Sequence, residues 1–186
     1  MSRGVPAAEK DGIGSVVFES YLRPNLLSGA VERVQALKAQ GSKVVIVSGS
    51  LDFIVEPVAR YLGVDAVLAA RMEQSPQGVL TGRLLGKPVS DAEKARLMQA
   101  YAAEHGFSLQ ECEVGCCRFA CAWRACLIRA ARLLPKKIFA TVQAYGDSMA
   151  DLPMLEAVGR PFCVSPDSRL RKVAQERAWP ILPWRG

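Results

Sequence analysis

Two carboxylates four residues apart, Asp147 and Asp151, follow a glycine in the sequence Gly146-Asp147-Ser148. An apolar run precedes the glycine, and apolar residues with helical spacing follow it, so we predict a strand, a tight turn and a helix. Asp147 then lies at the carboxyl end of a strand, where open parallel α/β sheets bind ligands. The two carboxylates together could hold a hard cation such as Mg²⁺. In the plainer alternative, Asp147 and Ser148 only cap the next helix.

Three further polar or small residues stand at the ends of predicted elements. Ser48 and Gly49 follow four β-branched residues, 44–47, which are typical of a buried parallel strand. A backbone N–H at such a glycine can approach an anion closely. Lys94 falls in the first turn of a helix that we expect to start at Ser90, the end where the helix dipole favours a cation least. This inconsistency marks Lys94 as a candidate, although an exposed lysine without a role is the plainer interpretation.

Helices and strands alternate along the chain around these residues. The patterns predict a helix from Ser28 to near Gly41, a helix with Pro57 in its first turn, a hairpin over 71–84, and strands over 43–50, 65–69 and 161–164. A helix after Asp167 and an extended segment over 179–182 follow. Residues 1–20 remain an unassigned tail. The alternation favours a doubly wound α/β sheet with helices on both faces.

Charge and cysteine are concentrated in one segment. Residues 112–143 contain six basic residues, one acidic residue and five of the six cysteines, and without them the chain, which has a net charge of +6, is close to neutral. We therefore expect no nucleic-acid partner and no membrane partner. No CxxC pair occurs, so neither a zinc site nor a disulfide framework is favoured. The start shows no signal-peptide pattern, and we expect a cytoplasmic protein.

The three sites together resemble motifs two, three and four of the haloacid dehalogenase-like (HAD) hydrolase superfamily. The similarity is greatest to its phosphoserine phosphatase-like subfamily IB, and a set of motifs is more specific than any one of them. It implies a Rossmann-like parallel sheet divided into a first part, 21–111, and a second part, 144–186. The Cys/Arg-rich residues 112–143 form an insertion between them.

The resemblance also implies roles. Ser48, by its hydroxyl, and Gly49, by its N–H, would bind the phosphoryl oxygens of a small phosphorylated metabolite. Lys94 would be catalytic, neutralising the charge of the phosphate and the nucleophile. Asp147 and Asp151 would belong to the Mg²⁺ site, with Ser148 and Asp151 supporting the lysine and the metal. Phosphoryl transfer depends mostly on positioning and on stabilisation by cations, which agrees with these residue types.

One motif of the resembled family has no counterpart. The family's nucleophile lies in a DxDxT or DxDxV sequence after the first strand, and the nearest candidate, residues 11–15, lacks the second aspartate. In the resembled fold that strand lies between the strands ending at Ser48 and Asp147. We therefore expect an N-terminally incomplete sheet and a chain without hydrolytic activity. The alternatives are a non-catalytic module that binds phospho-ligands and a truncated gene-model fragment.

The insertion has two interpretations. The foreign part runs from about Val114 to Gln143, and a translated retained intron would explain its abrupt change of composition. In the rival interpretation the segment is genuine, and Arg118, Arg129 and Arg132 lie on one side of a basic amphipathic helix at a membrane surface.

Overall fold

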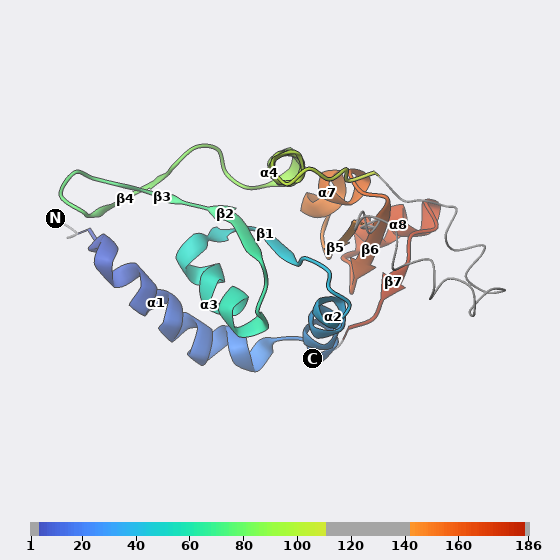
Figure 1. The fold of residues 1–186 in the computed structure, drawn as a ribbon, viewed down its shortest axis with the longest axis horizontal. Coiled ribbons are helices and arrows are strands. Elements are labelled where there is room, and N and C mark those ends of the chain that lie inside the picture. The colour runs from blue at the N-terminus through green and yellow to red at the C-terminus, as the bar shows by residue number, and fades with distance from the viewer. Residues whose placement is uncertain (1–3, 111–141, 185–186) are drawn as a thin grey trace, which may run out of the picture.

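The computed structural model describes residues 4–110 and 142–184 (Figure 1). The first part contains η1 (Ala7–Glu9), α1 (Lys10–Val17), η2 (Phe18–Leu22), η3 (Arg23–Asn25), α2 (Ser28–Ala39), β1 (Val45–Leu51), α3 (Asp52–Leu62), β2 (Ala66–Ala70), β3 (Met72–Gln74), β4 (Leu80–Leu84) and α4 (Asp91–Glu104). The second part contains β5 (Gln143–Gly146), η4 (Met149–Asp151), α7 (Leu152–Glu156), β6 (Arg160–Val164), α8 (Ser168–Glu176) and β7 (Ile181–Leu182). Both interpretations of the insertion concern residues that lie almost entirely outside these ranges.

The strands form three hydrogen-bonded groups. β1 pairs with β2 in parallel, and β5, β6 and β7 form a second parallel group in that order. β3 and β4 form the predicted antiparallel hairpin. The predicted α/β class with parallel strands is therefore confirmed. Within the described ranges β1 and β5 each have one edge without a strand partner.

The helix α3 starts earlier than the sequence suggested. Pro57 was expected in its first turn, but the helix begins at Asp52 and Pro57 is a buried interior residue. Proline has no N–H to donate to the carbonyl group four residues before it, which is that of Phe53. Helix α1 approaches that carbonyl oxygen so closely that a Cβ on Gly14 would overlap it. At the Phe53 carbonyl oxygen, helix α1 therefore packs in the place where the backbone N–H of residue 57 would otherwise donate a hydrogen bond.

The first twenty residues are part of the fold where they are described. Helix α1 lies against α3 (Figure 1), and Phe18 at its end is buried, with its ring 5.5 Å from that of Tyr61 in α3. The sequence left this segment unassigned because Gly12 and Gly14 weaken a helical pattern. No helix in the described ranges is both long and apolar enough to cross a membrane.

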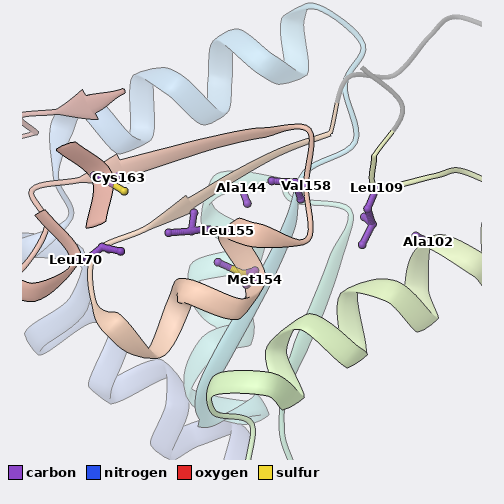
Figure 2. Close-up of a cluster of buried hydrophobic side chains, with 9 residues drawn as sticks. Ala102, Leu109, Ala144, Met154, Leu155, Val158, Cys163 and Leu170 are labelled. Atoms are coloured by element: carbon purple, nitrogen blue, oxygen red, sulfur yellow. The ribbon is translucent and has the colours of Figure 1, made fainter. Parts of the chain in front are cut away.

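The main core gathers around β5, β6, α4, α7 and α8 (Figure 2). Leu155, Cys163 and Leu170 are fully buried there, and Val47 of β1 packs against the same cluster. The periodic apolar residues of the helix predicted after Asp147 thus lie at the centre of this core. This core fixes the turn between β5 and α7 against α4, which positions the candidate site.

Candidate active site at the carboxyl ends of the strands

Lys94 and Asp151, 57 residues apart in the sequence, form an ion pair in which Nζ lies 2.6 Å from Oδ1. Their side chains are only 14% and 9% exposed. Lys94 reaches Asp151 from the first turn of α4, because α4 packs against α7 and the turn that precedes it. The structure therefore brings together two of the residues predicted for the site.

The second carboxylate oxygen of Asp151 organises the turn after β5. Oδ2 accepts hydrogen bonds from the N–H groups of Asp147 and Ser148, at 3.1 and 3.3 Å, and from the Ser148 hydroxyl at 3.4 Å. Ser148 is the N-cap of η4 and forms a capping box with Asp151. The close approach needs glycine at 146, because a Cβ there would lie 2.6 Å from the Asp151 Cβ. The capping interpretation of the sequence is confirmed for Ser148.

The two aspartates differ in their electrostatics. Burial alone would raise the pKa of Asp151, but the hydrogen bond and charge of Lys94, together with the two N–H donors, lower that pKa below its usual value. For Asp147, partial desolvation and then the Asp151 carboxylate raise the pKa, although the residue is largely exposed. Asp151 thus stays ionised beside the lysine, and a cation bound near Asp147 would lower the pKa of Asp147 again.

The donor set around Asp147 fits one ligand of a hard cation. Both oxygens of Asp151 already accept hydrogen bonds from Lys94 and the turn, whereas Asp147 is the exposed residue of this pair. Mg²⁺ in proteins often keeps several waters and takes only one or two carboxylates. In the described ranges no group of three or more His, Cys, Asp or Glu residues lies close enough to hold a metal. The carboxylates of the described residues alone therefore do not make up a complete coordination sphere for a metal.

Ser48 and Gly49 lie near the end of β1. Ser48 pairs with Ala69 of β2, and its Oγ accepts a hydrogen bond of 3.1 Å from the N–H of Ser50. Gly49 is exposed and packs against the chain leading into α4, where a Cβ would lie 2.9 Å from the carbonyl oxygen of Val89. Among the described residues no hydrogen bond joins Ser48 to Lys94 directly. The end of β1 thus lies close to the segment that leads into α4.

Asp167 is a supporting residue that the sequence showed only as a helix start. Its Oδ1 accepts from the N–H of Leu170 at 2.8 Å, and its Oδ2 accepts from the N–H of Met149 at 3.2 Å. Its own N–H donates to the carbonyl of Asp147 at 2.9 Å. Asp167 thus ties α8 to the turn that carries Asp147. An aspartate before a helix predicts the N-cap hydrogen bond, here to Leu170, but it does not predict the hydrogen bond from Met149.

Lys94, Ser48, Gly49 and Asp147 offer an ammonium, a hydroxyl, an exposed backbone N–H and an exposed carboxylate, respectively. The first three are suited to the oxygens of an anion, and the carboxylate is suited to a cation. A phosphoryl group accompanied by a divalent cation carries both kinds of partner.

Comparisons with known proteins agree with this chemistry. "Probable phosphatase Rv3661" from Mycobacterium tuberculosis is 32% identical over 98% of this chain and 52% of its own length. "Phosphoserine phosphatase SerB1" from the same species is 26% identical over 98% of this chain and 49% of its own length. A crystal structure of a Bordetella pertussis protein of unknown function is 27% identical with a TM-score of 0.74, covering 96% of this chain and 67% of that one.

The chain spans about half the length of the curated relatives that it matches. The model of one family, the haloacid dehalogenase-like hydrolases, matches residues 1–114, which is more than half of the sequence. The resemblance drawn from Ser48, Lys94 and the Gly146–Asp151 turn is therefore confirmed, and the chain belongs to the haloacid dehalogenase-like hydrolase family.

Proposed function

We propose that this site binds the phosphoryl group of a small phosphomonoester, as part of a Mg²⁺-dependent phosphomonoester hydrolase. The contact between Lys94 and Asp151 carries the proposal, because it fixes a buried ammonium beside the strand ends. A lysine held in this way keeps its position, so that phosphate binding does not carry the cost of ordering a flexible side chain. The names of the curated relatives, which include phosphatases, support the same reaction class.

Each residue has a role in this proposal. The Ser48 hydroxyl and the Gly49 N–H donate to phosphoryl oxygens, and Lys94 neutralises their charge. Asp151 is a positioning residue, because its oxygens hold Lys94 and the turn. Asp147 is a ligand of Mg²⁺, with Asp151 acting on the metal site only through the turn. When bound, Mg²⁺ would supply positive charge to the phosphoryl oxygens.

The sequence contains no DxDxT or DxDxV motif, so this chain lacks the nucleophile that the family uses. We propose that the isolated chain binds phosphate weakly, without requiring Mg²⁺, and does not hydrolyse phosphomonoesters. Mg²⁺ needs near-octahedral oxygen coordination, and Asp147 alone supplies one ligand. Lys94, in contrast, is held in place by Asp151 and does not depend on a metal for its position.

Titration calorimetry with inorganic phosphate tests this proposal. We expect weak binding both with and without Mg²⁺, and a loss of about tenfold or more in Lys94→Ala, as for a charge-assisted hydrogen bond. The matched control is Lys172→Ala, whose side chain is 79% exposed on α8 and which should leave the affinity unchanged. Binding that requires Mg²⁺, or that is unchanged in Lys94→Ala, would show that the site is wrongly assigned. Hydrolysis of p-nitrophenyl phosphate that disappears in Asp147→Ala would contradict the proposed inactivity.

A further inference from the structure

The free edges of β1 and β5 belong to strands that end at the same side of the fold. Each strand has a parallel partner on one edge, and within the described ranges neither has a partner on the other. The start of α4 meets the carboxyl ends of both. A Cβ on Gly49, near the end of β1, would lie 2.9 Å from the carbonyl oxygen of Val89 just before α4, and Lys94 in its first turn contacts Asp151 after β5.

Helices bridge β1 and β5 on both faces of the sheet. On one face α4 contacts β1 and packs against α7, which contacts β5. On the other face Arg33 of α2 donates to the Gln143 Oε1 at 2.9 Å and to the Tyr145 hydroxyl at 2.7 Å, and α2 also contacts α3, which lies against β1. Figure 1 shows α4 and α2 on opposite sides of these strands. The two edges are therefore held near each other, although the strands are not paired.

The hydrogen-bond pattern shows which backbone groups of β5 point to its free edge. In β6 the N–H of Cys163 donates to the carbonyl of Pro180, just before β7, at 2.9 Å, so the backbone groups of Phe162 point the other way, toward β5. Phe162 pairs with Tyr145, and in a parallel ladder it bonds to the residues on either side of that partner. The backbone N–H and C=O groups of Tyr145 and Gln143 therefore point to the free edge.

The free edge of β1 carries apolar side chains that are only half-buried. Val45, Ile46 and Val47 remain partly exposed, although β2 pairs with this strand and α3 and α4 contact it. Such β-branched residues in a parallel sheet are normally buried on both faces. Val47 also packs against the core cluster that contains Ala144 of β5. A strand between β1 and β5 would cover these three residues and continue that core.

We propose that the free edges of β1 and β5 together bind one extended strand of another polypeptide, parallel to both. The proposal does not depend on phosphate binding. Parallel binding agrees with the neighbouring pairs, which are all parallel. Because helices cover both faces, the bound strand should be a continuous apolar run of about four residues, the length of β5. Main-chain hydrogen bonds supply the affinity in this mode of recognition, and side chains supply the selectivity.

A separate extended segment fits these edges better than a second folded copy of the chain. Binding between β1 and β5 requires a strand with both edges free. Every strand in the described ranges already has a partner on at least one edge. A second copy would therefore have to release a strand from its own sheet before that strand could pair on both sides.

Fluorescence anisotropy with a labelled peptide tests the proposal on the intact chain. The probe is a blocked hexapeptide with the sequence of residues 43–48, which contains a continuous apolar run. We expect saturable binding and a higher melting temperature of the chain with peptide. A peptide N-methylated at alternate residues lacks donors on one edge and should bind at least about tenfold more weakly. An analogue with aspartate in place of the isoleucine should weaken similarly, because its carboxylate would be buried.

Two substitutions at Gln143 provide a matched comparison. Gln143→Pro removes an N–H from the free edge, and proline is tolerated at the first residue of a strand. Gln143→Ala loses the same contact with Arg33 but keeps this N–H. The peptide should bind about fivefold more weakly to Gln143→Pro than to Gln143→Ala, as for one hydrogen bond. Circular dichroism checks that both variants fold, and the N-methylated peptide makes the same test if Gln143→Pro does not.

A nitroxide on the peptide locates the bound strand by broadening amide signals in NMR spectra of the chain. At the carboxyl end of the peptide it should broaden the signals of Gly49 and Ser148, and at the amino end that of Gln143. The reverse pattern, or broadening confined to β2 or β7, overturns the proposed parallel strand between β1 and β5. Absence of saturable binding, or equal binding of the N-methylated peptide, overturns it as well. Self-association that disappears in Gln143→Pro, in a chain that binds no peptide, would assign these edges to a second copy instead.

Discussion

Lys94 Nζ and Asp151 Oδ1 are 2.6 Å apart, and their contact joins the first turn of α4 to the turn after β5. Removing the Asp151 side chain should destabilise the folded chain more than removing the Lys94 ammonium. Asp151→Ala leaves a largely buried ammonium uncompensated and also removes the acceptor for two N–H groups, so it should lower the free energy of unfolding by about 3 kcal/mol. Lys94→Met leaves the Asp151 carboxylate without a counter-ion but with its N–H donors, and should cost about 2 kcal/mol. Urea unfolding followed by circular dichroism measures both.

The control for this pair is Lys172→Met on α8. Its Nζ lies 4.0 Å from Glu176, and its side chain is 79% exposed, so its loss should change the free energy of unfolding by less than about 0.5 kcal/mol. If Lys94→Met proved as costly as Asp151→Ala, the additional hydrogen bonds of Asp151 would not matter for stability.

Two glycines on α1 provide a matched comparison of packing. A Cβ at Gly14 would overlap the carbonyl oxygen of Phe53, whereas a Cβ at Gly12 would have nothing within 4 Å. Gly14→Ala should therefore separate α1 from α3 and destabilise the chain by about 2 kcal/mol. Gly12→Ala should stabilise it by about 0.5 kcal/mol, because alanine has the higher helix propensity. Thermal unfolding of both variants tests this, and a loss of stability in Gly12→Ala would argue against the packing account.

Local signals were sufficient for much of the fold. The β-branched run 44–47 predicted the strand observed as β1, and Gly63 ends α3 at a φ of +66°, which glycine adopts more readily than other residues. The position of Ser90 likewise predicted the N-cap of α4. These features depend on residues within one or two turns of each other, which is why the sequence shows them.

The features that the sequence did not predict depend on contacts between residues that are far apart in the chain. Helix α1 packs against α3 with Gly14 close to the Phe53 carbonyl, a contact between distant residues that no local pattern shows. At the site, spacing alone could not show that Lys94 meets Asp151; that expectation came from the family resemblance. The second contact of Asp167, with Met149, was missed for the same reason.

Asp65, which accepts a hydrogen bond from the residue just before β1, should make the stability of the folded chain sensitive to acid. Its Oδ2 accepts from the N–H of Val44 at 2.7 Å and from Lys38 Nζ at 3.3 Å, and chiefly the first of these lowers the pKa of Asp65 below 3.8. A lowered pKa means that the stabilisation is fully present above pH 3.8 and is lost as the pH falls through the folded-state value. Because the side chain is 35% exposed, Asp65→Asn should cost no more than about 1 kcal/mol at neutral pH.

Urea unfolding of both proteins across this pH range measures the effect. The difference between the unaltered chain and Asp65→Asn should shrink as the pH falls below 3.8. A difference that grows instead would mean that the carboxylate is not stabilised in the folded chain.

The unpaired edges of β1 and β5 should limit the stability of the isolated chain. Within the described ranges neither strand has a partner on its second edge, and Val45, Ile46 and Val47 of β1 are only half-buried. An edge strand leaves backbone N–H and C=O groups without a strand partner, and these groups can pair with a strand of another chain. We expect thermal unfolding below about 45 °C, the lower end of the usual range for domains, and self-association that increases with protein concentration. Circular dichroism melting at several concentrations, with sedimentation velocity, tests both effects. A cooperative transition at high temperature in a chain that stays monomeric would show that these edges are covered.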